Sequence, residues 1–454
     1  MRCVWFLLVG AVVADLRRPP LRSGLVTRGG GGGGGGVVSV PRVVPAAGVG
    51  GAVHHGMTPL ELGCCIVADL CPHGMLPLAW AAAKGGGTGT APTLLVLVAF
   101  AAASSYTLYV SARLAEADAR RPSSVALSSL WSGAGLPGAR GVDAAVAVLC
   151  GGCCVFYATF AADLFHALLA SCAPNVHVSR AAVVAALTAA PLAPLCLSDD
   201  LSVLKYSSYA GLAGVLYTAL FFVRAGATTT AASAATALKV PVWRFSSGSA
   251  VLANTLVVAF LCHYNALQYY QELHPAQRSP RKYGLVAASA FGVTACVFAC
   301  TLFGGRAAFG ATALPNVLKN LDASVPAHLA KLGTGVAILS GFPLMFAGLK
   351  AALDGAVPAL KRGPKRRTNL VHTALLALFA VCAAVATDDD IGLVIELLGS
   401  TLGCAAVYVV PGVAAARAPS FSSTERRVGA AVAAAGTLLA CFGTFITVTT
   451  HTGH

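Results

Sequence analysis

Long apolar stretches recur along the chain from about residue 58 to residue 449, separated by short polar or basic connections. Each has about the length that a helix needs to cross a bilayer. None shows the period-two alternation typical of a membrane-spanning β-strand. The stretches predicted to span a membrane are the eleven ranges 58–83, 91–112, 142–171, 181–197, 203–223, 249–272, 283–303, 327–349, 369–386, 391–414 and 427–449. We therefore expect an all-α, polytopic membrane protein with a transmembrane domain over residues 57–450.

Two segments of different character precede the first span. Residues 1–16 hold one arginine and an apolar run that is too short to span comfortably, which resembles the core of a signal peptide. Whether this segment is a cleaved targeting peptide stays open. Residues 17–56 combine five arginines with a run of glycines at positions 29–36. Such a segment has no apolar face to pack, so we expect a flexible basic tail.

The composition supports the membrane interpretation. Of the 454 residues, 57% are apolar and only 11% are charged, whereas soluble domains carry about 25% charged residues. The apolar content is also too high for a disordered chain. The chain would therefore meet a lipid bilayer over much of its surface.

The net charge of +14 has two possible explanations, a nucleic-acid partner or basic loops on one face of a membrane. With the N-terminal tail placed in the cytosol and the eleven spans alternating, 23 of the 31 lysines and arginines fall on the cytosolic side. This bias is what the positive-inside rule requires of a correct topology. The charge thus indicates topology, and it gives no reason to expect a nucleic-acid partner.

Cysteines and histidines give no sign of a metal site or an enzyme. Cys150, Cys153 and Cys154 have a metal-like spacing, but no second pair accompanies them, and cysteine in an apolar helix behaves as a small hydrophobe. His54 and His55 precede the first span without an acidic partner at a useful spacing. We expect neither a metal nor an organic cofactor, and no membrane-embedded enzyme such as an acyltransferase.

Ionisable side chains at bilayer depth cost several kcal/mol, so each is a functional candidate. They are Asp69, His73, Asp163, His166, His263 and Glu396. Asp163 and His166 lie three residues apart and share a helix face. They would either relay protons as a pair or only satisfy each other inside the bundle. No lysine or arginine lies near Glu396 along the sequence, so a basic residue on another helix is its expected partner.

Two of the predicted spans contain features that interrupt a helix. Pro72 and Pro77 flank His73 and Gly74 in the first span, and proline removes a backbone donor and clashes with the preceding turn. The alternatives are a broken helix, tolerated in a membrane only when buried or lining a cavity, and a simple proline kink. The sixth span is the most polar of all, with His263, Asn265, Gln268 and Gln271. In a fold of two inverted five-helix repeats, the first and sixth helices are the pair that break.

Four stretches together carry a family resemblance. They are GMLPLAWA at residues 74–81; PLCL at 194–197 followed by LKYSS at 204–208; FLCH at 260–263 running to YQEL at 270–273; and LLGST at 397–401 running to VPG at 410–412. In order and spacing they resemble the amino acid/auxin permease family, particularly its vacuolar and sodium-coupled neutral amino acid transporter branches. The resemblance covers residues 58–449. It implies a leucine-transporter-like fold and symport or antiport of neutral amino acids, driven by Na⁺ or H⁺.

The chain also departs from this family at positions that concern the coupling ion. Ala68 stands where sodium-coupled members carry an asparagine that serves the cation site, and Glu396 replaces a small residue. Ser340 lies near the position where a hydroxyl would complete that cation site. Protonation at Asp69 or His73 therefore becomes the more natural hypothesis for coupling. Asp163, His166 and Glu396 are the further coupling candidates.

The resulting hypothesis is a secondary transporter that works by alternating access in the plasma membrane or in a vacuolar or other internal membrane. The substrate carboxylate would meet the broken first helix near His73, Gly74 and Met75, where helix amides favour an anion. His263 and Asn265 would shape the opposite wall. The alternative is an amino acid sensor of the same fold that does not transport, since Pro72 offers no amide to a substrate.

Overall fold

The computed structural model describes residues 56–117, 125–173, 175, 177–198, 204–228, 240–386 and 396–452. Residues 1–16 and all of the expected basic tail except Gly56 lie outside these ranges. The regular secondary structure of the described residues is helical, apart from one isolated β-bridge between Met57 and Leu273.

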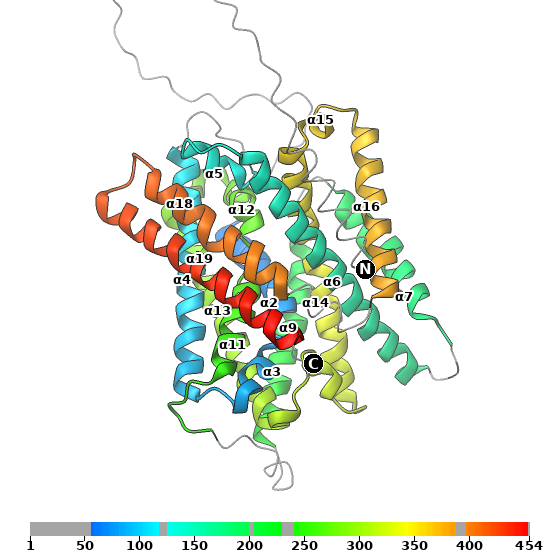
Figure 1. The fold of residues 1–454 in the computed structure, drawn as a ribbon. Coiled ribbons are helices and arrows are strands. Elements are labelled where there is room, and N and C mark those ends of the chain that lie inside the picture. Colours follow the sequence, from blue (N-terminus) through cyan, green and yellow to red (C-terminus); the bar gives the residue numbers. More distant parts are fainter. Residues whose placement is uncertain are drawn as a thin grey trace, which may run out of the picture. The chain divides into compact units, whose positions relative to one another are not determined.

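The α-helices of the described residues are labelled in Figure 1 where there is room. They are α2 (Pro59–Gly74), α3 (Leu78–Ala83), α4 (Thr90–Ala117), α5 (Ser128–Gly133), α6 (Ala139–Cys172), α7 (Arg180–Leu187), α8 (Ala193–Leu197), α9 (Leu204–Ala227), α11 (Ser247–Ala259), α12 (Ala266–Glu272), α13 (Pro280–Phe309), α14 (Val325–Ala356), α15 (Pro358–Lys361), α16 (Lys365–Val385), α18 (Val410–Arg417) and α19 (Ser423–Thr452). Short 3₁₀ segments are η1 (Lys84–Gly86), η4 (His263–Asn265), η5 (Pro275–Gln277), η6 (Gly310–Thr312) and η7 (Val317–Asn320), and π-helical segments are η2 (Thr188–Leu192), η8 (Gly399–Gly403) and η9 (Ala405–Val409).

The expected spans correspond to these helices one for one. Ten helices in the described part of the chain are long and apolar enough to cross a membrane, and the bent pair of α2 and the helix from Leu78 to Gly86 makes an eleventh. The fourth span is continuous through α7, η2 and α8, because Pro191 is accommodated in a π-helical turn. The predicted number of spans is therefore confirmed.

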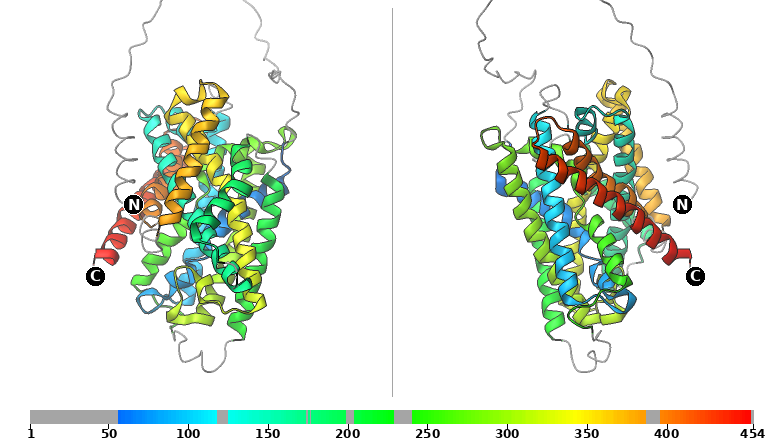
Figure 2. Two further views of the ribbon diagram at one scale, coloured as in Figure 1. Left: turned by 90° about the vertical axis from the view of Figure 1, so that its right-hand side faces the viewer. Right: turned by 60° about the vertical axis from the view of Figure 1, so that its left-hand side comes forward.

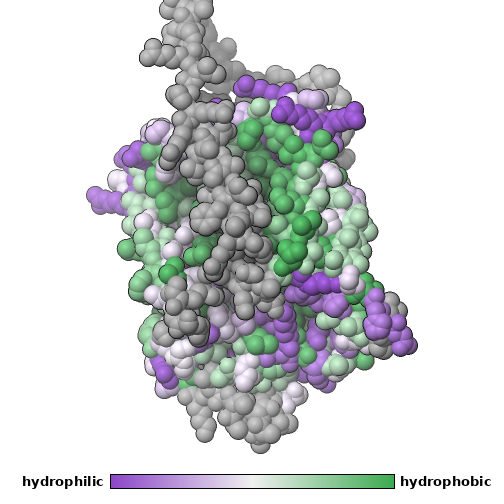
Figure 3. All heavy atoms as spheres, turned by 45° about the vertical axis from the view of Figure 1, so that its right-hand side comes forward, coloured by the Kyte–Doolittle hydropathy of each residue, from purple (hydrophilic) through white to green (hydrophobic). Residues whose placement is uncertain are grey.

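The spans differ in how deeply they lie inside the bundle. In Gly248–Glu272 and Val325–Ala356, 72% of the most apolar stretch is buried, against 22% in Lys365–Val385 and Ser423–Thr449. The sixth and eighth spans are thus central, whereas α16 and α19 lie at the periphery (Figure 2). In Figure 3, hydrophobic residues form a continuous area on the upper part of the visible face, with hydrophilic residues above it and below it, as expected of a surface in contact with lipid.

The first span breaks later than the prolines alone suggest. Thr58 and Glu61 cap the start of α2 reciprocally, and the helix runs through Pro72 and His73 to Gly74. The chain then bends at residues 75–77 by 54° before α3 begins. Pro77, which has no N–H group, precedes the first residue of α3. The break is therefore real, but it follows His73 instead of including it.

The sixth span breaks near its middle, as expected. α11 ends at Ala259, the next three residues are irregular, and η4 leads into α12. Phe260, Leu261 and Cys262 are completely buried. Irregular backbone at bilayer depth is tolerated when protein surrounds it, because water cannot satisfy its polar groups there. The two broken helices are thus both enclosed by the bundle.

Glycines allow α9 to pack tightly against two neighbours. A Cβ atom at Gly214 would collide with the backbone of Gly333 in α14, and one at Gly304 in α13 would collide with the backbone of Phe222 in α9. Small residues at such contacts let membrane helices approach closely. The fifth span is therefore held between the seventh and the eighth by backbone contact.

Candidate functional site

Asp69 lies in α2, five residues before its last residue Gly74, and is completely buried. Its two carboxylate oxygens accept hydrogen bonds from the sixth span: Tyr264 donates to Oδ1 at 2.8 Å and Tyr269 donates to Oδ2 at 2.7 Å. Within the described residues, no lysine, arginine or histidine forms an ion pair with it. A buried carboxylate without a counter-charge is costly, so a proton or another positive charge is expected to accompany it.

His73 joins three spans beside this carboxylate. Its Nε2 lies 3.0 Å from the carbonyl oxygen of Val258, which can only accept, so Nε2 carries a hydrogen. Its Nδ1 lies 2.5 Å from the hydroxyl of Tyr157 in α6. In the neutral ring Tyr157 donates to Nδ1. The same hydroxyl lies 3.3 Å from the backbone oxygen of Asp69, an alternative acceptor if Nδ1 became protonated.

His263 and Asn265 lie in the break of the sixth span, and both are completely buried. His263 Nε2 lies 3.0 Å from the carbonyl oxygen of Ser104 in α4 and 2.8 Å from the hydroxyl of Thr107. Asn265 donates through Nδ2 to the carbonyl oxygen of Leu344 in α14 at 2.8 Å. Each side chain also has a buried atom without a hydrogen-bond partner among the described residues, Nδ1 of His263 and Oδ1 of Asn265.

The eighth span presents glycines to this region. Gly341 and Gly348 are seven residues apart and so lie on one face of α14. A Cβ atom at Gly341 would lie 3.3 Å from the carbonyl oxygen of Ala68, and one at Gly348 would collide with the ring of Tyr264. α14 thus lets both broken helices approach it closely.

Gly74, Met75 and Ser340 are near the break but are engaged by other groups. The Met75 amide donates to the carbonyl oxygen of Cys71 at 3.2 Å. A Cβ atom at Gly74 would meet the ring of Phe298 in α13. The Ser340 hydroxyl lies 2.7 Å from the carbonyl oxygen of Ser207 and 2.8 Å from that of Val336, so its hydrogen is used by a backbone acceptor.

Asp163, His166 and Glu396 lie apart from this cluster. Asp163 binds Arg180 of α7 at 2.6 Å, and Lys319 of η7 lies 3.9 Å from its other oxygen. His166 instead lies 3.1 Å from the carbonyl oxygen of Val178, so the expected contact between Asp163 and His166 is not made. Glu396 is the first described residue of the tenth span, and none of the contacts around Asp69 involves it.

Arg180 explains why Asp163 occupies a membrane helix. Its guanidinium donates from Nη1 to the carbonyl oxygens of Ala383 and Ala384 in the last turn of α16, at 2.5 and 3.0 Å, while Nε binds Asp163. These last-turn carbonyls have no donor within their own helix. Asp163 thus neutralises an arginine that joins the third, fourth and ninth spans.

We predict that Asp163→Asn lowers stability without changing coupling. The pair is partly exposed, with 24% and 21% of the two side chains accessible, so its loss should cost about 1 kcal/mol. Thermal stability in detergent and uptake driven by a pH gradient would be measured together. A variant of normal stability whose uptake no longer follows the pH gradient would instead identify Asp163 as part of a proton relay.

The sequence-based candidates omitted the three tyrosines that organise the site. Tyr157, Tyr264 and Tyr269 are each buried and each lies within hydrogen-bond distance of Asp69. A buried carboxylate requires hydrogen-bond donors. The side chain of tyrosine is suited to this role inside a membrane, because its ring is apolar and its hydroxyl group donates. Tyr264 and Tyr269 lie on either side of Asn265 in the polar stretch of the sixth span. This position in the sequence was the available sign that they belong to the site.

Two enclosed broken helices around a buried ionisable cluster define a membrane transporter of the leucine-transporter-like fold. Two solved structures share the fold. One is a manganese transporter from Eremococcus coleocola, crystallised with an aromatic bis-isothiourea substituted compound, with 12% identity, a TM-score of 0.57, and 87% of this chain and 88% of that chain covered. The other is MhsT in complex with L-phenylalanine, with 13% identity, a TM-score of 0.52, and 86% of this chain and 96% of that chain covered.

Sequence comparison gives the family. Residues 55–450 match the family described as transmembrane amino acid transporter protein, and the chain belongs to that family. A curated relative, sodium-coupled neutral amino acid transporter 7 from Xenopus laevis, is 23% identical over 270 residues. The match covers 56% of this chain and 57% of the length of that relative. The expected fold class and family are thus confirmed.

Proposed function

We propose that the chain carries neutral amino acids across its membrane by alternating access, with uptake coupled to protons. Family membership and the fold shared with MhsT, which was crystallised with L-phenylalanine, support an amino acid as substrate. The observation that carries the coupling proposal is the buried carboxylate of Asp69, held by Tyr264 and Tyr269 without a counter-charge among the described residues. The N-terminal side of the membrane domain would face the cytosol, in agreement with the distribution of basic residues.

The break in the first span would receive the substrate carboxylate. Because the Met75 amide is already bonded to Cys71, we assign this role to the next free donors, the amides of Leu76 and Leu78. Neither donates to a backbone acceptor within the described residues, and both residues are buried. Amides at the start of a helix are suited to an anion.

The break in the sixth span would receive the substrate ammonium group. Three buried atoms in the break and in the following helix α12 lack a hydrogen-bond partner among the described residues: Nδ1 of His263, Oδ1 of Asn265 and, in α12, Oε1 of Gln268. With the hydrogen of His263 on Nε2, facing the Ser104 carbonyl, Nδ1 is an acceptor as well. An ammonium group supplies three donors, which complements such a set.

Asp69 and His73 would take and release the coupling proton. A proton on Asp69 removes the cost of a buried charge. A proton on Nδ1 of His73 would turn the Tyr157 hydroxyl from that nitrogen to the backbone oxygen of Asp69, 3.3 Å away. Either change alters a contact between the first span and its neighbours, which is how protonation would be linked to movement. Sodium coupling has less support, because Ala68 supplies no side-chain oxygen.

Uptake into proteoliposomes tests the proposed function. The purified full-length protein would be reconstituted and offered a panel of labelled amino acids, with pH and sodium gradients imposed separately. We expect uptake of neutral amino acids that follows the pH gradient and does not respond to sodium. Uptake driven by sodium alone would contradict proton coupling. Specific binding without any flux would instead favour a sensor of the same fold.

A further inference from the structure

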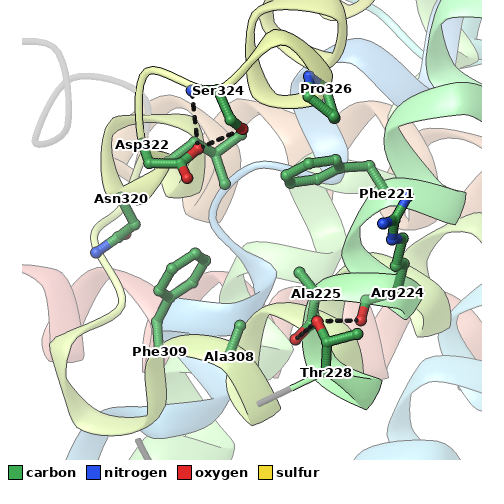
Figure 4. A pocket seen from close by; sticks show the side chains of 11 residues that line it. Phe221, Arg224, Ala225, Thr228, Ala308, Phe309, Asn320, Asp322, Ser324 and Pro326 are labelled. Carbon is green, nitrogen blue, oxygen red and sulfur yellow. Dashed lines mark hydrogen bonds between the residues drawn. The ribbon is translucent and has the colours of Figure 1, made fainter. Parts of the chain in front are cut away.

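A cavity of about 480 Å³, none of whose lining residues belongs to the broken helices, lies at the ends of α9 and α13 and against the loop that leads into α14 (Figure 4). Its lining includes Phe221, Arg224, Thr228, Phe309, Asn320 and Asp322. By the topology expected from the basic loops, this is the non-cytosolic end of the bundle. None of the lining residues belongs to the cluster around Asp69, so the cavity is a separate feature.

The cavity carries one positive and one negative side chain. Arg224 projects from α9 and Asp322 from the loop, on different sides of the opening (Figure 4). In the described part of the chain, no carboxylate pairs with the Arg224 guanidinium. Asp322 accepts from the Ser324 hydroxyl at 2.7 Å, and this bond holds the pKa of its carboxyl below the ordinary value. Both charges are therefore present at neutral and mildly acidic pH.

The remaining walls are partly apolar. Phe221, Phe309 and Pro326 border the same space, and the volume lies in the range of sites for small molecules. Asp322 would repel a simple anion. A metal ion would have a single carboxylate ligand and would be repelled by the positive charge of Arg224. A molecule that carries both charges and an apolar group fits all three features, which describes a neutral amino acid in its zwitterionic form.

The loop that closes the cavity is held in place by its own contacts. Asn320 accepts from the Leu314 amide at 2.9 Å and donates to the Thr312 carbonyl oxygen at 3.0 Å. Ser324 caps the start of α14, and Lys331 donates to the carbonyl oxygen of Leu321 at 3.1 Å. A preformed wall lowers the entropy cost of binding a small ligand.

We propose that this cavity is a second binding site for a neutral amino acid, distinct from the transport site. The choice of an amino acid as occupant rests on the proposed function, while the preference for a zwitterion rests on Arg224, Asp322 and the aromatic walls. An occupant would link α9 to the loop between α13 and α14. The site would thus respond to amino acid on the non-cytosolic side.

Protection of an introduced cysteine tests the proposal. Thr228→Cys places a thiol in the lining, and Thr312→Cys is the matched control, since both threonines are exposed and donate to a carbonyl of the preceding turn. The full-length variants in detergent would react with N-ethylmaleimide, and mass spectrometry would quantify the peptide that contains each introduced cysteine. At about ten times the dissociation constant, leucine should slow the reaction at position 228 about tenfold, because only unoccupied protein reacts.

Further variants and ligands separate this site from the transport site. Leucine should still protect position 228 in the Asn265→Ala background, which removes a proposed ligand contact of the transport site. It should not protect position 312, and it should lose most of its effect at position 228 when Arg224→Gln is added. 3-Methylbutylamine and 4-methylpentanoate, which each lack one charge of leucine, should protect poorly. Loss of protection in the Asn265→Ala background, or equal protection by either singly charged analogue, would overturn the proposal. If leucine protects position 228 but the reconstituted protein takes up no amino acid, the proposed function is contradicted and the second binding site is not.

Discussion

Asp69→Asn should abolish uptake driven by a pH gradient. Tyr264 and Tyr269 donate to the two carboxylate oxygens at 2.8 and 2.7 Å. Asparagine keeps the size of the side chain, its oxygen can accept from one of these hydroxyls and its NH2 group can donate to the other, but it cannot bind and release a proton. Accumulation should therefore fall to the level of empty vesicles. Exchange of labelled for unlabelled amino acid should remain measurable, because it requires no net movement of protons. Both quantities can be measured in the same proteoliposomes.

The control for this experiment is Asp163→Asn, which removes a different described carboxylate of a membrane helix, in α6. Asp163 is paired with Arg180 and makes no contact with the cluster around Asp69, so its variant should keep proton-driven uptake. If uptake by the Asp69→Asn variant still tracked the pH gradient, Asp69 would have no part in coupling. His73 and Tyr157 would then be the next groups to replace.

Gly214→Val should prevent α9 and α14 from packing at the distance they have in the structure, and so destabilise the fold. A Cβ atom at Gly214 would collide with the backbone of Gly333, and neither helix can relieve that contact by rotating a side chain. Overpacked cores lose about 1 to 3 kcal/mol, and a backbone clash belongs at the upper end. We expect little monodisperse protein and a clearly lower melting temperature, measured by size-exclusion chromatography after heating.

Gly292→Val is the matched control for this prediction. Gly292 also lies in a long membrane helix, α13, but it is exposed and a Cβ atom there would meet nothing within 4 Å. Its variant should remain monodisperse and keep the melting temperature of the wild type. Equal stability of the two variants would show that close approach of α9 to α14 is not required for the fold.

The sequence determined the architecture because the bilayer imposes a strong constraint on it. Each crossing must satisfy its backbone hydrogen bonds within a helix and must be about 20 residues long, so the apolar stretches were sufficient to locate all the spans. Pro77 and the polar stretch around His263 likewise indicated the two breaks. In both cases the signal is local, since it depends on residues that are neighbours in the chain.

The partners of the polar residues were decided by tertiary structure alone. Asp69 is bonded to tyrosines about 200 positions later in the chain, and Asp163 selects Arg180 over His166, although His166 is three positions away on the same helix. Spacing along a helix shows which side chains share a face, but the packing of the other helices decides which groups that face meets. The sequence by itself therefore determined the spans and their interruptions, whereas the hydrogen-bonded cluster and the cavity beside Arg224 exist only because distant helices pack together.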